Sequence, residues 1–200
     1  MLQIRHLTIR HRKDNRIILE DLSITLHRGD RAALIGEEGN GKSTLLKWIY
    51  DPDLVSSYAD AEGERSCRGE VLAFLPQELP EEDRDRPVRE YLSDLPAFLS
   101  ATPADLSGTA SALGFSPALF ESDRPMGTLS GGERIKVRMA GLLLGRPDFL
   151  LLDEPSNDLD LDGLKWLRGP SPPSPGASCI SPMTRPFWTK RPTGSSCWSS

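Results

Sequence analysis

The fold of this 200-residue chain is decided by the stretch Ala32-Ala-Leu-Ile-Gly-Glu-Glu-Gly-Asn-Gly-Lys-Ser-Thr44. Its first four residues are apolar and predict a short buried strand. Three glycines then follow within six residues and predict a tight turn. From Ser43 to about Tyr50 the sequence predicts a helix that ends before Pro52. A strand, a glycine-rich turn and a helix in direct succession are typical of an α/β fold.

The chain on either side of this stretch alternates between strands and helices. Alternating apolar residues predict half-exposed antiparallel strands over 2–9 and 17–26, and continuous apolar runs predict buried strands at 71–75 and 149–152. We therefore expect a mostly parallel core sheet with an N-terminal antiparallel β subdomain, in one domain over 1–168 with a small helical subdomain at 80–126. Helices are predicted near 87–99, 103–113, 131–144 and 161–168.

Composition and charge narrow the classes of function. Apolar residues make up 38% of the chain and charged residues 26%, as in a soluble domain with a packed core. The net charge of −5 argues against a broad nucleic-acid-binding surface. Three widely spaced cysteines indicate a reducing compartment, and no signal peptide or run of 18 apolar residues is found. We expect a cytoplasmic chain without direct membrane insertion, so that any membrane role would come through a partner.

The glycine-rich turn has the spacing of a phosphate-binding P-loop. Its backbone N–H groups would surround the phosphates of ATP, at a helix N-terminus that carries about half a positive charge. Lys42 would reach the β- and γ-phosphates, and the Ser43 hydroxyl would bind Mg²⁺. Two acidic residues of the loop are expected to point to solvent, and the alternative is a flexible glycine turn. The expected ATP-binding residues are Gly36, Glu37, Glu38, Gly39, Asn40, Gly41, Lys42, Ser43 and Thr44.

Two carboxylates follow the second buried apolar run, in Phe149-Leu-Leu-Leu-Asp-Glu154. A strand that ends in Asp-Glu places both at the carboxyl edge of the sheet, where ligands bind in open α/β folds. Asp153 suits Mg²⁺, directly or through water, and Glu154 suits polarisation of an attacking water. The alternative is a strand end with two solvated acids.

A second candidate phosphate site lies in Leu129-Ser-Gly-Gly-Glu133, where Ser130 and two glycines open a helix. Ser130 and Glu133 also fit a capping box, a purely structural reading. That reading leaves Gly131 and Gly132 unexplained, because glycine weakens a helix by roughly 1 kcal/mol relative to alanine.

These three motifs, in this order, resemble the ATP-binding cassette (ABC) family over residues 1–168. The resemblance implies a P-loop NTPase fold of ABC type that binds ATP and Mg²⁺, with Glu154, Lys42 and Gln77 carrying hydrolysis. It implies that Gln77 senses Mg²⁺ and water. It also implies that Ser130, Gly131 and Gly132 cap the γ-phosphate held by a second cassette, which the segment 157–160 reaches, so that the active unit contains two cassettes. The family often stacks adenine on an aromatic residue, and here only His11, Arg12 or a solvated turn is available.

The motifs also bear on which branch of the family the chain resembles. Soluble twin-cassette proteins of the F type, many of which act on ribosomes, usually carry Pro-Thr-Asn-His-Leu-Asp, similar to Pro155-Ser-Asn-Asp-Leu-Asp160 here. Transporter cassettes usually carry Ser-Ala-Leu-Asp. The 53 positions between Gln77 and Ser130 leave little room for the F-type arm. The alternatives are an ATP-binding subunit that docks a membrane permease and a truncated ATP-binding module with little turnover.

The composition changes abruptly after Arg168. Residues 169–200 hold seven prolines, eight serines and no acidic residue, which predicts a disordered tail. The family carries Ser-His-Asp-x-x-Phe-Leu in this region, and its histidine contacts the γ-phosphate; this chain has no such motif.

A displaced reading frame could encode that motif. If each codon is read as the last base of one codon and the first two of the next, Met183-Thr184 forces Asp and Phe187-Trp188 forces Leu. The other positions permit Ser-His before that Asp and Glu-Ala-Phe after it. We therefore hypothesise a frameshift after about residue 168, and the alternative is coincidence.

Overall fold

The computed structural model describes residues 1–35, 39–153 and 178–183, and these divide into two compact units. The first unit contains Met1–Phe74, Asp148–Asp153 and the described residues near the C-terminus, and the second contains Leu75–Pro147. The predicted helix at 161–168 lies outside the described residues. Within the described part of the chain, no helix is long and apolar enough to cross a membrane.

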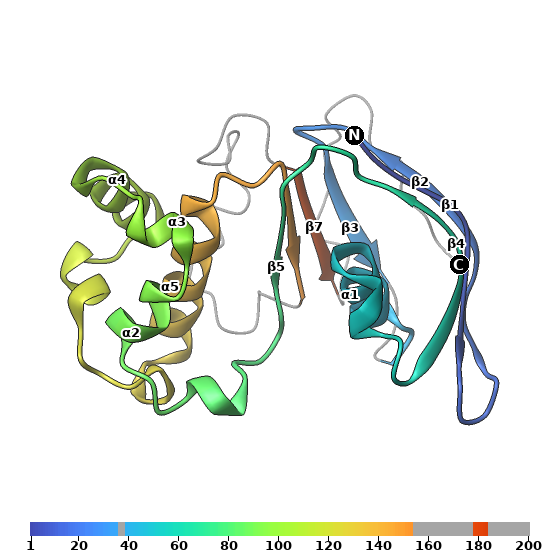
Figure 1. Ribbon diagram of the computed structural model, residues 1–200, viewed down its shortest axis with the longest axis horizontal. Helices are drawn as coiled ribbons and strands as arrows, with labels where there is room; N and C mark the ends of the chain where they lie inside the picture. Colours follow the sequence, from blue (N-terminus) through green and yellow to red (C-terminus); the bar gives the residue numbers. More distant parts are fainter. Residues whose placement is uncertain (36–38, 154–177, 184–200) are drawn as a thin grey trace. The chain divides into compact units, whose positions relative to one another are not determined.

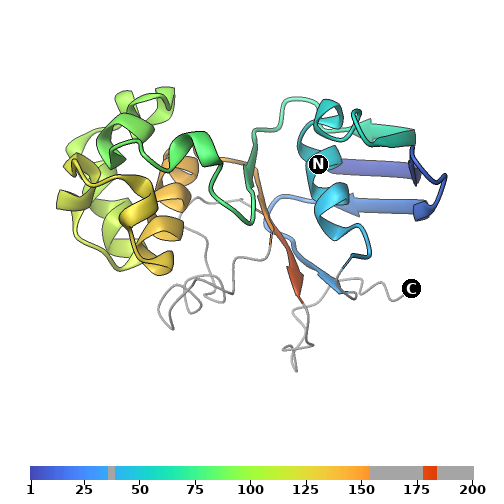
Figure 2. The same ribbon diagram turned by 90° about the horizontal axis from the view of Figure 1, so that it is seen from below.

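A three-stranded antiparallel sheet forms one side of the first unit (Figures 1 and 2). Its order is β2-β1-β4, with β1 at Leu2–His11, β2 at Ile17–Leu26 and β4 at Ala59–Ser66. The alternating apolar residues of β1 are buried, as their spacing predicted: Leu2, Ile4, Leu7 and Ile9. The strand β4 was not predicted from the sequence, because only Ala59 of its eight residues is buried.

A four-stranded sheet in the order β3-β7-β6-β5 lies on the other side of the first unit. Its strands are β3 (Arg31–Ile35), β5 (Leu72–Leu75), β6 (Phe149–Leu152) and β7 (Ser178–Met183). All four residues of β6 are buried, as the continuous apolar run predicted. The pairings of β7 with β3 and with β6 are both parallel, in agreement with the predicted core sheet.

The strand β7 corrects the prediction of a disordered tail for its six residues, Ser178–Met183. That prediction used the average composition of residues 169–200. A strand between β3 and β6 needs main-chain partners on both sides, which those two strands supply. Residues 169–177 and 184–200 lie outside the described residues.

The helix α1 (Lys42–Tyr50) lies between the two sheets of the first unit, and a short 3₁₀-helix, Pro52–Leu54, follows it (Figure 1). Its apolar residues pack with the inner face of β1 and with β6 in one hydrophobic core. This packing fixes the N-terminal end of α1 relative to the carboxyl end of β6. The residues that join them are Leu45, Leu46, Trp48, Ile49, Phe149 and Leu151.

The second unit is helical. The predicted helix at 87–99 is two helices, because Asp94 and Leu95 leave the helix before Pro96 starts the next one. Three phenylalanines, Phe98, Phe115 and Phe120, form edge-to-face contacts inside the unit. Its α-helices are α2 (Val88–Ser93), α3 (Pro96–Leu99), α4 (Pro103–Leu113) and α5 (Gly131–Leu144), with 3₁₀-helices at Glu81–Asp83, Pro117–Glu121 and Met126–Thr128.

Candidate functional site

Glycine is required where the loop enters α1. Gly41 is the N-cap of this helix and has a φ of 76°, in the left-handed region that favours glycine. A Cβ at this position would lie 2.1 Å from Cγ2 of Ile18, so a side chain is also excluded by contact. Gly39 has a φ of 84°. Gly36, Glu37 and Glu38 lie outside the described residues.

The first turn of α1 is suited to an anion. It contains no acidic residue, and its N-cap, Gly41, has no side chain that could cap the first N–H groups. The N–H groups of such a turn have no partner within the helix, and the helix dipole adds positive potential there. Lys42 starts the helix and is 9% exposed, followed by Ser43 and Thr44. A phosphate group is the kind of ligand that this arrangement binds.

Ser43 connects this turn directly to the end of β6. Its Oγ donates a hydrogen bond of 2.9 Å to Oδ1 of Asp153, which is 3% exposed. Burial raises the pKa of Asp153, against the opposing effects of the Ser43 hydrogen bond and of the charges on Lys47 and Lys42. A divalent cation would offset this cost of burying a carboxylate, and hydroxyl and carboxylate oxygens are the ligands that Mg²⁺ prefers. The two side chains therefore fit a magnesium ion.

Replacement of Asp153 with asparagine is expected to stabilise the nucleotide-free protein at pH 7. Because the pKa of Asp153 is raised on folding, keeping this carboxyl ionised costs stability at pH values above the raised pKa. Asparagine resembles the protonated form and can still accept from Ser43. We expect the thermal midpoint to rise by about 2–4 °C, which is about 1 kcal/mol for a chain of this size.

Scanning calorimetry at several pH values would test this expectation. The difference between the two thermal midpoints should shrink as the pH falls below the ordinary aspartate pKa of 3.8, because the carboxyl is then mostly protonated in both the folded and the unfolded state. An unchanged or lower midpoint at pH 7 would show that the ionised carboxylate is stabilising where it lies.

In the second unit, Ser130 is the N-cap of α5 and forms a capping box with Glu133. The Ser130 Oγ accepts from the Glu133 N–H at 3.2 Å, and the Glu133 Oε2 accepts from the Ser130 N–H at 3.0 Å. The capping box that the sequence offered as a purely structural explanation of these two residues is therefore present in the molecule. Gly131 and Gly132 form the start of the first turn.

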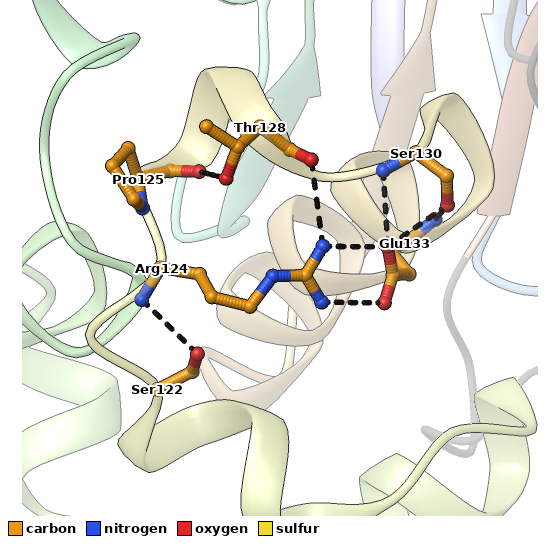
Figure 3. Close-up of polar contacts among 6 residues, drawn as sticks. All are labelled: Ser122, Arg124, Pro125, Thr128, Ser130 and Glu133. Atoms are coloured by element: carbon orange, nitrogen blue, oxygen red, sulfur yellow. Dashed lines mark hydrogen bonds and ion pairs between the residues drawn. The ribbon is translucent and has the colours of Figure 1, made fainter.

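Arg124 holds Glu133 from the other side (Figure 3). Its two terminal nitrogens reach the two carboxylate oxygens at 3.0 and 3.3 Å, and one of them also donates to the Thr128 carbonyl at 3.4 Å. The Arg124 side chain and the Ser130 N–H lower the pKa of Glu133 to about 2. The start of α5 is thus fixed by a charged pair, which sequence reasoning did not identify.

The segment that contains Gln77 is also held by α5. Arg138 is 6% exposed, and its Nη2 donates to the carbonyl oxygens of Pro76 at 2.8 Å and of Glu78 at 3.1 Å. These two residues flank Gln77 in the sequence. Sequence analysis missed Arg138, although an arginine at a position between the apolar Val137 and Met139 of a buried helix was a signal.

The structure thus brings Lys42, Ser43, Thr44 and Asp153 together in the first unit, and places Gln77 and the Ser130–Gly132 turn in the second. Glu154 and the segment 157–160 lie outside the described residues. The two residues considered for adenine are engaged in exposed contacts: His11 Nδ1 with Asp14 at 2.8 Å, and Arg12 Nε with Asp60 at 2.7 Å.

Comparison with known proteins identifies the family of this chain. A family model described as ABC transporter matches residues 19–157, which is more than half of the chain. The chain belongs to the ABC family of ATP-hydrolysing domains. It is 31% identical over 187 residues to the energy-dependent translational throttle protein EttA of Mycobacterium tuberculosis, covering 92% of this ABC chain and 32% of EttA. It is 34% identical over 155 residues to the ATP-binding protein Uup of Escherichia coli, covering 76% of this chain and 23% of Uup.

Both EttA and Uup are members of the F-type branch of the ABC family. This ABC chain spans between 12% and 35% of the length of the curated relatives that it matches. Among solved structures, an ABC transporter ATP-binding protein from Pyrococcus furiosus matches with a TM-score of 0.68 and 24% identity, over 93% of both chains. That likeness supports the predicted ABC-type fold.

Proposed function

We propose that this chain binds Mg·ATP on the loop Gly36–Thr44 and hydrolyses it to ADP and phosphate at an interface with a second cassette. The observation that carries the proposal is the hydrogen bond of 2.9 Å from Ser43 to the buried Asp153. It joins the helix that follows the glycine loop to the end of β6, so that one site offers both an anion-binding turn and oxygen ligands for a cation.

Each residue of this site has a part in binding. The N–H groups of the loop and of the first turn of α1 donate to the phosphates. Lys42 places its charge at the β- and γ-phosphates. Ser43 and Asp153 would hold Mg²⁺, which neutralises charge on the phosphate oxygens when bound. Thr44 continues the same turn.

The remaining residues complete the reaction. Glu154 polarises the attacking water, and Gln77 positions that water. The turn of Ser130, Gly131 and Gly132 contacts the γ-phosphate on the second cassette, which is either another copy of this chain or the other half of a longer protein. The capping box does not exclude this contact, because it engages the Ser130 and Glu133 N–H groups and leaves the Gly131 and Gly132 N–H groups outside it.

We further propose that this ATPase is of the F type and drives a conformational switch at the ribosome. Support comes from the segment 155–160 and from the similarity to EttA, a translational throttle protein by name. The second candidate, the ATP-binding subunit of a membrane transporter, is favoured by the likeness in fold to such a subunit. Co-sedimentation with ribosomes would support the first proposal, and co-purification with a permease would support the second.

Replacement of Lys42 with alanine tests the P-loop assignment. The change removes the cation from the phosphates and is expected to weaken Mg·ATP binding at least tenfold, about 1.4 kcal/mol. Isothermal titration calorimetry of both proteins measures this directly. The control is Arg89→Ala, since it removes a positive charge from an exposed ion pair with Asp123 in the second unit. Equal affinities for the wild-type and Lys42→Ala proteins would refute the assignment.

A further inference from the structure

The side chain of Arg138 is hydrogen-bonded to the backbone on both sides of Gln77. One nitrogen, Nη2, donates to the carbonyl oxygens of two residues that lie two apart in the chain, Pro76 and Glu78. The residue between them is the one proposed to position the attacking water. A single planar group therefore holds the main chain on both sides of Gln77.

The location of Arg138 makes this contact difficult to explain as a surface interaction. The side chain is 6% exposed, on a helix whose neighbouring residues Val137 and Met139 are fully buried. Burial lowers the pKa of Arg138, and Tyr91 opposes that shift, but an arginine remains charged at neutral pH. A buried cation is costly unless it is well hydrogen-bonded, and here the carbonyl oxygens beside Gln77 supply such bonds.

Arg138 also lies on the same helix as the proposed contact to the second cassette. It is eight residues after Ser130, the N-cap of α5, which is about 12 Å along the helix axis. Between the two positions α5 is continuous helix, so its N-terminal turn and the Gln77 segment are connected through one rigid element.

We infer that Arg138 is a positioning residue for ATP hydrolysis. By its hydrogen bonds to the carbonyl oxygens of Pro76 and Glu78, it holds Gln77 where that residue can orient the attacking water. This inference rests on the proposed function, because it assumes that Gln77 takes part in hydrolysis. Arg138 itself touches neither the nucleotide nor the water in this account.

Replacement of Arg138 with methionine keeps an unbranched stem and removes the donors. We expect kcat to fall about 10–100-fold, the usual effect of losing a residue that orients a catalytic group. The affinity for Mg·ATP should stay within about twofold, because Lys42, Ser43 and Asp153 are unchanged. Arg138→Lys keeps the charge but loses the planar group, and its kcat should lie between those of the wild type and Arg138→Met. The matched control is Arg89→Met, which removes an arginine from an exposed ion pair with Asp123.

A double-mutant cycle separates positioning from general stability. If Arg138 acts through Gln77, the Gln77→Ala/Arg138→Met protein should be no slower than Gln77→Ala alone. If the two effects on kcat multiply instead, Arg138 contributes only to the stability of the unit and the inference is overturned. Arg138→Lys provides the same comparison should the methionine variant fail to fold.

Amide hydrogen exchange of the nucleotide-free protein gives a readout that does not depend on hydrolysis. Peptides that cover residues 75–79 should exchange faster in Arg138→Met than in the wild type and in Arg89→Met. Unchanged exchange would overturn the inference while the proposed function stands. Faster exchange together with a Gln77→Ala protein of normal kcat would instead overturn the proposed role of Gln77, and with it the positioning role of Arg138 in hydrolysis.

Discussion

The Glu154→Gln protein is expected to bind ATP with nearly wild-type affinity and to hydrolyse it about 10²–10⁴-fold more slowly, since it keeps the shape of the side chain and loses the general base. Glu154 directly follows Asp153, whose position is fixed by the hydrogen bond to Ser43. The trapped nucleotide should also favour an ATP-bound pair of cassettes. Single-turnover hydrolysis, ATP titration and gel filtration measure the three quantities.

The neighbouring carboxylate provides the control for this experiment. Asp153→Asn should mainly weaken Mg·ATP binding, because Asp153 is proposed as a ligand of the metal ion, whereas Glu154→Gln should mainly lower kcat. The two variants change one oxygen each at adjacent positions, so a general disturbance of the strand end would affect both alike. Unchanged turnover of Glu154→Gln would show that Glu154 is not the catalytic carboxylate.

The parts of the fold that could be predicted from the sequence are those with an apolar pattern. The continuous run at 149–152 and the alternation in residues 2–9 each mark a buried face, and both are strands with those faces in the core. The strand Ala59–Ser66 could not be predicted in this way. It pairs with β1 through its backbone while most of its side chains face solvent, so its sequence, Ala-Asp-Ala-Glu-Gly-Glu-Arg-Ser, has no apolar alternation.

In the candidate site, too, the residues that could be predicted are those that belong to a local sequence pattern. The positions Lys42, Ser43 and Asp153 could be predicted because each stands in a local motif, and the contact between Ser43 and Asp153 follows from the way the core packs α1 against β6. Arg138 and Arg124 act on residues 60 and 9 positions away, respectively. Such contacts depend on tertiary structure, and no local pattern specifies them.

The position of β7 bears on the frameshift hypothesis. Its register pairs Met183 with Ile35, the last residue before Gly36 of the loop. In the displaced frame, the codons that permit Ser-His-Asp span residues 181–184. The histidine would therefore fall at the carboxyl end of this strand, level with the start of the phosphate-binding loop. The chain as it stands has histidines only at positions 6, 11 and 27, all before the loop.

Restoration of that frame after codon 168 is therefore expected to raise the rate of ATP hydrolysis by about 10²–10³-fold, the usual contribution of one preorganised donor to a transition state. Steady-state rates of the two proteins should be compared at equal ATP occupancy, so that a difference in binding does not enter. Replacing the restored histidine with alanine is the control, because it keeps the new strand and removes only the donor. If the increase in the hydrolysis rate disappears in that control, the increase is due to the histidine. Equal rates for the original and restored chains, with both folded, would show that residues 169–200 are not a displaced catalytic segment.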